Sequence, residues 1–165
     1  MPTSNVQDPF EYLIEDHKKI ALLLAQAVSG PPAARERQFS EIKDALSLHM
    51  ELEETAIYPV LKGREGTRTQ AIEAKEEHRL MKALLAELSA ISPKDDEWGK
   101  KLRLLKAEVE RHVSEEEGSF FPKAKKELSR EDGEMVRREM ARFLGAPAAR
   151  VRGLNAADED PREAP

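Results

Sequence analysis

Apolar residues recur every three or four positions along four long stretches of this chain, as in helices that bury one face. Asp8 followed by Pro9 marks the start of the first stretch, and the Ser-Gly-Pro-Pro run at 29–32 marks its end. The pattern predicts helices over about 9–28, 33–61, 69–91 and 97–122. The residues expected to face inward are Phe10, Leu13, Ile14, Ala21, Leu24 and Val28, then Phe39, Ile42, Leu46, Leu52, Ala56 and Val60, then Ala71, Ala74, Met81, Leu85 and Leu88, and last Trp98, Leu102, Leu105, Val109 and Phe120.

Short loops join these long helices, and this combination favours an all-α fold, an antiparallel up-down four-helix bundle. Pro59 is expected to kink the second helix or to mark its last turns. Ser129 and Asp132 form a capping box, which predicts a short fifth helix that ends at Gly145. Residues 146–165 are rich in Ala, Pro and charge and lack periodicity, so we expect one domain over 1–145 and a disordered C-terminal tail over 146–165.

The amino-acid composition of the chain excludes several classes of site and of partner. The 165 residues contain no cysteine, which excludes disulfides and thiolate metal sites. The net charge is −5 with both signs interspersed, whereas a nucleic-acid-binding protein would show a basic stripe. No signal peptide is visible, and no apolar run approaches the roughly 20 residues of a membrane span. We therefore expect a cytoplasmic protein with no nucleic-acid or membrane partner.

Two segments of the chain repeat one pattern. HMELEETAIYP at 49–59 and HVSEEEGSFFP at 112–122 both begin with histidine, carry glutamate four residues later and end in an aromatic residue and proline. The other two histidines, His17 and His78, precede these segments at nearly equal distances. The chain therefore reads as two copies of one helical hairpin, related by an approximate two-fold axis.

The four histidines and two of the glutamates lie in phase with the apolar stripes of their helices. Residues four apart on a helix differ by only about 40° in direction, so each His-x-x-x-Glu pair faces the same way. A single such pair is usually a surface pair, and metal-free His–Glu hydrogen bonds are the alternative to metal binding. Matched positions on all four helices favour a metal site instead, and imidazole with carboxylate suits iron, zinc or manganese. The candidate ligands are His17, His49, Glu53, His78, His112 and Glu116, enough for two ions joined by the two glutamates.

This pattern resembles the hemerythrin family, in particular the bacterial HHE cation-binding domains, over about residues 8–126. The resemblance implies a non-haem centre of two iron ions, which an oxo or hydroxo group can bridge. It implies that His17 and His49 hold one iron, that His78 and His112 hold the other, and that the two glutamates bridge them.

Two positions depart from the pattern of oxygen-carrying hemerythrins. Those proteins have a further histidine on the third helix where this chain has Ala74, and an aspartate where this chain has Glu117. We expect Glu116 to be the ligand because it repeats Glu53, with Glu117 in reserve. The missing histidine leaves an open position on one iron, which favours reaction over oxygen storage.

The leading hypothesis is therefore a di-iron protein that binds or processes dioxygen, peroxide or nitric oxide. The alternatives are an iron-sensing or iron-donor module and a metal-free helical interaction domain. Tyr58 is expected to pack the end of the bundle, with a role as metal ligand as the alternative. Asp16, Glu77 and Glu115 are candidates to orient the histidines from behind, with a solvated position on the surface as the alternative.

Overall fold

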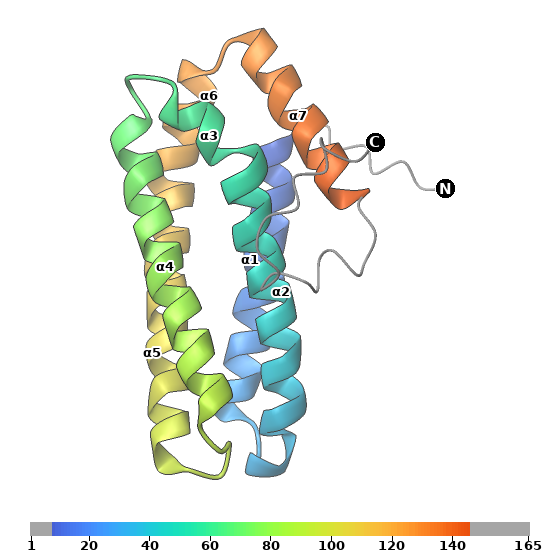
Figure 1. The fold of residues 1–165 in the computed structure, drawn as a ribbon, viewed down its shortest axis with the longest axis vertical. Coiled ribbons are helices and arrows are strands. Elements are labelled where there is room, and N and C mark those ends of the chain that lie inside the picture. The colour runs from blue at the N-terminus through green and yellow to red at the C-terminus, as the bar shows by residue number, and fades with distance from the viewer. Residues whose placement is uncertain (1–7, 146–165) are drawn as a thin grey trace, which may run out of the picture.

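The computed structural model describes residues 8–145, and all regular structure in that range is helical (Figure 1). The all-α prediction is therefore confirmed for these residues, whereas the predicted tail at 146–165 lies outside them. Four long helices lie side by side, and consecutive ones run in opposite directions. Each contacts two neighbours around the molecule, so α1 packs on α2 and α5, and α4 packs on α5 and α2. Their bounds are α1 Pro9–Ser29, α2 Arg35–Ala56, α4 Arg68–Ala90 and α5 Asp96–Glu115.

Shorter elements close the two ends of the molecule. They are a 3-10 turn η1 Pro32–Ala34, the helix α3 Tyr58–Lys62, a π-helical turn η2 Glu116–Phe120, the helix α6 Phe121–Glu127 and the fifth helix α7 Arg130–Leu144. The helix α7 folds back against α2 and α1 at the end that carries α3 and α6 (Figure 1).

The caps predicted from the sequence begin their helices. The carboxylate of Asp8 accepts a hydrogen bond from the backbone N–H of Phe10 at 2.9 Å, with Pro9 in the first helical position. At α7, the Ser129 hydroxyl accepts from the N–H of Asp132 and the Asp132 carboxylate accepts from the N–H of Ser129, which completes the capping box. Gly145 ends this helix, as predicted.

The two prolines of the repeat interrupt their helices in different ways. In the first copy α2 stops at Ala56, Ile57 takes φ −115° and ψ −59°, and Pro59 lies in the first turn of α3. In the second copy the chain inserts the π-helical turn η2 before Pro122, where the N–H of Phe121 donates to the carbonyl of Glu116. The expected interruption near Pro59 is present, and the π-helical turn is a feature that the periodicity did not predict.

A polar layer divides the core into two apolar clusters. One cluster surrounds Phe120 and Phe121 near α3 and α7, and the other surrounds Trp98 at the opposite end. Most residues predicted to face inward belong to one of these clusters. Ala21 is an exception, because it is exposed and Ile20 takes the buried position. None of the helices within residues 8–145 has both the length and the apolar character to cross a membrane.

Candidate metal centre

The layer between the two apolar clusters contains every histidine of the protein. His17 projects from α1 and His78 from α4, while α2 and α5 with η2 contribute one His-x-x-x-Glu pair each. All six side chains are buried, with at most 2% of any residue exposed. The structure therefore brings together the whole set predicted from the sequence: His17, His49, Glu53, His78, His112 and Glu116.

Two groups of ligand atoms form within this layer. The first consists of His17, His49, Glu53 and Glu116, each of which offers one atom within 4.8 Å of the others. The second consists of Glu53, His78 and His112, by the same criterion. The imidazole pairs are closely matched, because ring centroids lie 4.8 Å apart both in His17–His49 and in His78–His112. This equivalence agrees with the internal repeat read from the sequence.

The two glutamates lie between the groups. Glu53 directs Oε1 to Nε2 of His49 at 3.4 Å and Oε2 to Nε2 of His78 at 3.1 Å. Glu116 places Oε2 3.2 Å from Nε2 of His17 and 3.5 Å from Nε2 of His112. Each carboxylate thus faces one imidazole of each pair, as a bridging ligand must.

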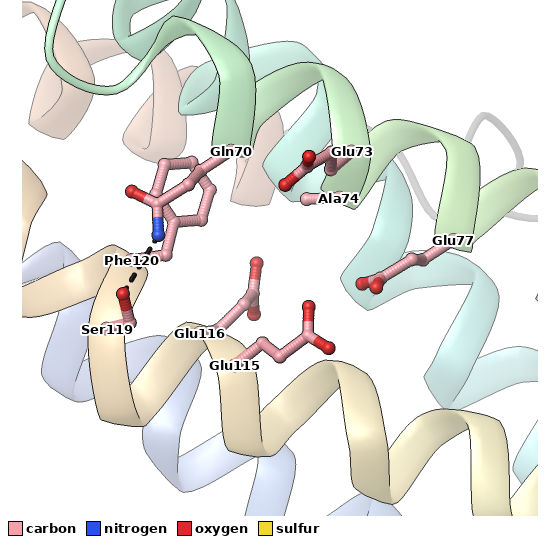
Figure 2. Close-up of a pocket in the computed structure, with 8 residues that line it drawn as sticks. All are labelled: Gln70, Glu73, Ala74, Glu77, Glu115, Glu116, Ser119 and Phe120. Carbon is pink, nitrogen blue, oxygen red and sulfur yellow. Dashed lines mark hydrogen bonds between the residues drawn. The ribbon is translucent and has the colours of Figure 1, made fainter.

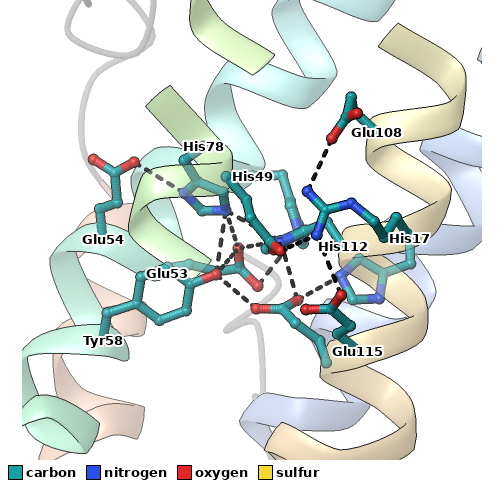
Figure 3. Close-up of polar contacts among 12 residues, drawn as sticks. His17, His49, Glu53, Glu54, Tyr58, His78, Glu108, His112 and Glu115 are labelled. Atoms are coloured by element: carbon teal, nitrogen blue, oxygen red, sulfur yellow. Dashed lines mark hydrogen bonds and ion pairs between the residues drawn. The ribbon is translucent and has the colours of Figure 1, made fainter. Parts of the chain in front are cut away.

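A second ring of carboxylates lies behind the imidazoles and near their Nδ1 atoms. Figure 3 labels one of them, Glu54, beside His78. Each of these acids is the chain neighbour of one of the six central residues, and each serves the histidine of an adjacent helix. The pairs close a circle around the four helices: Glu117 with His17 at 2.8 Å, Asp16 with His49 at 3.5 Å, Glu54 with His78 at 2.9 Å and Glu77 with His112 at 2.7 Å.

The sequence identified only part of this outer ring. Asp16 and Glu77 were candidates for it, whereas Glu115 pairs instead with Arg111 at 3.2 Å. Glu54 was missed, although its position directly after Glu53 is a signal that adjacency to a candidate ligand could have provided. Glu117 lies behind His17 and Glu116 lies in the centre, which favours Glu116 of the two alternatives.

Tyr58 enters the centre instead of only packing the end of the helices. Its hydroxyl donates to Oε1 of Glu116 at 2.6 Å and lies 3.1 Å from Oε2 of Glu53. The same oxygen is 3.2 Å from Nε2 of His78. A third oxygen donor is therefore within reach of the second group, beside the two glutamates.

The lone pairs of the nitrogen and oxygen atoms in this layer are stabilised by a positive charge between them. Donation from Nδ1 to the outer carboxylates leaves the Nε2 lone pairs of neutral histidines pointing inward. Nε2 of His78 and Nε2 of His112 face each other at 3.2 Å, where two lone pairs repel unless a proton or a cation lies between them. Among residues 8–145, the buried atoms without a hydrogen bond include Nε2 of His17, Nε2 of His49, Oε1 of Glu53 and Oε2 of Glu116. These residues fit a metal cation.

The pKa shifts of the residues in and behind this layer also indicate that a positive charge stabilises it. Burial alone would lower the pKa of His112, but the charge of Glu116 and the hydrogen bonds to Glu53 and Glu77 raise it to about 10. Burial would raise the pKa of Glu77, but the hydrogen bonds and charges of His112 and Arg111 lower it to about 2. For Glu53, burial is likewise outweighed by the charge of His49 and the hydrogen bonds to His112 and His78, so its pKa lies well below its usual range. The carboxylates of the layer therefore stabilise a positive charge beside them.

A cleft of about 240 Å³ connects this layer with the surface (Figure 2). It lies between α4 and the segment formed by α5 and η2, and Ala74 and Glu116 are part of its wall. Ala74 is the position at which the sequence departs from oxygen-carrying hemerythrins, so the small side chain leaves space beside the centre.

The fold and this layer together define an all-helical protein with a buried cation-binding centre of histidines and carboxylates. The family described as Hemerythrin HHE cation binding domain matches residues 8–124. This chain belongs to the hemerythrin HHE cation-binding domain family.

Two similar proteins place this chain among its relatives. A protein of Mycobacterium kansasii, described as a hemerythrin HHE cation binding domain-containing protein, has the same fold, with a TM-score of 0.70, 24% sequence identity, and coverage of 91% of this chain and 95% of that one. A DNA nickase of Nostoc sp. (strain PCC 7120 / SAG 25.82 / UTEX 2576) is 32% identical over 131 residues, which are 79% of this chain and 36% of the relative. The chain thus spans about a third of the length of that relative.

Proposed function

We propose that this protein is a di-iron hemerythrin that binds or processes a small oxidant, either dioxygen, peroxide or nitric oxide, within an up-down four-helix bundle. The observation that carries the proposal is the convergence of four Nε2 atoms and two carboxylates in one buried layer. His17 and His49 hold one ion, and His78 and His112 hold the other. Glu53 and Glu116, whose carboxylates each face one imidazole of each pair, would be ligands shared by the two ions.

The residues around the ions have separate tasks in this proposal. The outer carboxylates of Glu117, Glu54 and Glu77 accept hydrogen bonds that orient three of the imidazoles and keep the proton on Nδ1. Asp16 lies 3.5 Å from Nδ1 of the fourth, His49. The hydroxyl oxygen of Tyr58 lies 2.6 Å from Oε1 of Glu116, to which it donates, and from this position the hydroxyl can supply a ligand oxygen or a hydrogen bond to a bound molecule. The apolar clusters above and below exclude water from the layer. When bound, iron supplies Lewis-acid binding of the oxidant and exchange of electrons with it.

The space beside Ala74 favours reaction over simple oxygen storage. No histidine occupies this position, and the cleft reaches Glu116 at the same place. A small molecule can therefore approach the centre from the side of Glu116. We propose a small-molecule ligand and no nucleic-acid partner, since the chain carries a net charge of −5.

Iron content and reactivity test this function together. Protein purified from iron-replete cells is expected to contain two iron ions per chain and to change its absorption spectrum on addition of peroxide or nitric oxide. The variant Glu65→Gln, altered in the exposed loop after α3, is the control and is expected to behave as the wild type. Iron far below one ion per chain, or a spectrum that no oxidant changes, would contradict the proposal.

A second candidate is an iron-sensing or iron-donor module, in which occupancy of the centre controls folding. The opposed Nε2 atoms of His78 and His112 favour it, because this arrangement is costly without a cation. Thermal melting with and without iron separates the candidates. A large stabilisation by iron, together with no reaction toward oxidants, would favour the sensing or donor role.

A further inference from the structure

The cleft beside Ala74 differs from the rest of the metal layer in its access to solvent. Elsewhere the layer lies between the two apolar clusters, and its six central residues are at most 2% exposed. The cleft runs from exposed Glu73 and Glu115 inward to Glu116, whose Oε2 makes no hydrogen bond among residues 8–145. The residue at the inner end of the cleft, Glu116, is therefore one of the ligands of the proposed centre.

Polar contacts join the two sides of the cleft, and Figure 2 shows the one between Gln70 and Ser119. At one end the amide of Gln70 on α4 donates to the hydroxyl of Ser119 on η2 at 3.0 Å. At the other end Arg111 contacts Glu77 at 2.6 Å and Glu115 at 3.2 Å. Space is left between these two bridges, where Ala74 contributes no more than a methyl group.

The charge of the cleft is strongly negative. Four of its eight lining residues are glutamates, Glu73 and Glu77 on α4, Glu115 on α5 and Glu116 on η2, and no lysine or arginine is among the eight. Of these, Glu77 and Glu115 share the single guanidinium of Arg111. A concave wall of one charge sign focuses the field and raises the local concentration of counter-ions. Such a passage attracts a divalent cation and repels anions.

We propose that this cleft is the entry route by which ferrous ions reach the centre, with Glu73 and Glu115 as the outer carboxylates that capture the hydrated ion and Glu116 as the inner one that receives it. The proposal rests on the di-iron function proposed above. In this proposal Glu73 and Glu115 affect the rate of iron uptake and are not ligands in the loaded centre.

The rate of iron uptake tests the route. Metal-free protein is mixed anaerobically with ferrous ion, and the unbound ion is trapped with a coloured chelator at successive times. The double variant Glu73→Gln/Glu115→Gln is compared with Glu76→Gln/Glu110→Gln, which removes the same charge from exposed positions of the same helices outside the cleft. At low ionic strength the first double variant is expected to load roughly 3- to 10-fold more slowly than the control and the wild type. The difference is expected to shrink in 1 M salt, where the screening length falls to about 3 Å.

The final occupancy separates this route from the function itself. Support for the route is slower uptake with an unchanged final content of two ions per chain. Uptake at the rate of the control would overturn the route and leave the di-iron function intact. A lower final content in Glu73→Gln/Glu115→Gln would also overturn it, because these residues would then belong to the centre. A wild type that takes up no iron would overturn both proposals.

Discussion

The carboxylate of Glu77 on α4 accepts a hydrogen bond from Nδ1 of His112 on α5 at 2.7 Å, and its other oxygen contacts Arg111 at 2.6 Å. Glu77 directly precedes His78, so one segment of α4 supplies a ligand to the centre and an orienting group to the next helix. On the other three helices, an acid next to one of the central residues likewise lies behind the histidine of an adjacent helix. The orientation of each imidazole therefore depends on the packing of the neighbouring helix.

Replacement of this orienting carboxylate is expected to weaken metal binding. In Glu77→Gln the charge behind His112 is lost, and affinity for the second ion is expected to fall roughly 10- to 100-fold. Titration against a competing chelator measures this affinity. Glu76→Gln is the matched control, since Glu76 pairs with exposed Arg79 and is expected to have no effect. Equal affinities in the two variants would show that Glu77 does not position the ligand.

The hydroxyl of Tyr58 is expected to stabilise the metal-free protein. Tyr58→Phe removes the donor to Glu116 and leaves buried carboxylate oxygens with fewer partners, at an expected loss of about 1–3 kcal/mol in the free energy of unfolding. Urea denaturation of metal-free protein measures the loss. Tyr12→Phe, at a partly buried position of α1, is the control and is expected to change it less. A Tyr58→Phe variant as stable as the wild type would argue against this role.

His49 offers a test of the metal-free alternative. Its Nε2 lies 3.4 Å from Oε1 of buried Glu53, whose pKa the charge of His49 helps to lower, so His49→Leu is expected to destabilise the metal-free protein. The same variant is expected to lose at least one of the two ions, as measured by metal analysis. His78→Leu is the comparison, because His78 is hydrogen-bonded to Glu54 and its loss is expected to destabilise the metal-free protein as well. Full metal content in His49→Leu would remove it from the ligand set.

The docking of α7 is expected to depend on pH. Hydrogen bonds from Arg64, then from Ser129, lower the pKa of Asp132 below its ordinary value of 3.8. Because the pKa is lower in the folded state, this contribution to stability is complete above pH 3.8 and is lost as pH falls through the folded-state value. The difference in the free energy of unfolding between wild type and Asp132→Asn is therefore expected to be constant near neutral pH and to shrink below pH 3.8. Glu131→Gln is the control, and a difference independent of pH would contradict the expectation.

Helical periodicity was sufficient to predict the long helices and the six central residues. The phase of His17 between Ile14 and Ala21, for example, placed it in the core, where it is 2% exposed. Periodicity is less reliable between adjacent positions, and it selected Ala21 where Ile20 is buried.

Features that depend on tertiary contacts were harder to predict. The π-helical turn adds one residue to a turn, which a constant period cannot represent, and it begins at the point where Glu116 and Glu117 diverge. Tyr58 was expected to pack against the end of the helices. Its contact with Glu116 joins two distant segments of the chain, so the sequence pattern did not predict it. Glu54 and Glu117 face helices other than their own, so only the assembled fold reveals their partners.

Anomalous diffraction from crystals of iron-loaded protein, recorded at the iron absorption edge, tests the central claim most directly. Two peaks are expected, one between the imidazoles of His17 and His49 and one between those of His78 and His112, with Glu53 and Glu116 bound to both. A map with no peak in this layer, or with iron only at surface carboxylates, would contradict the assignment of these six residues as the ligands of a di-iron centre.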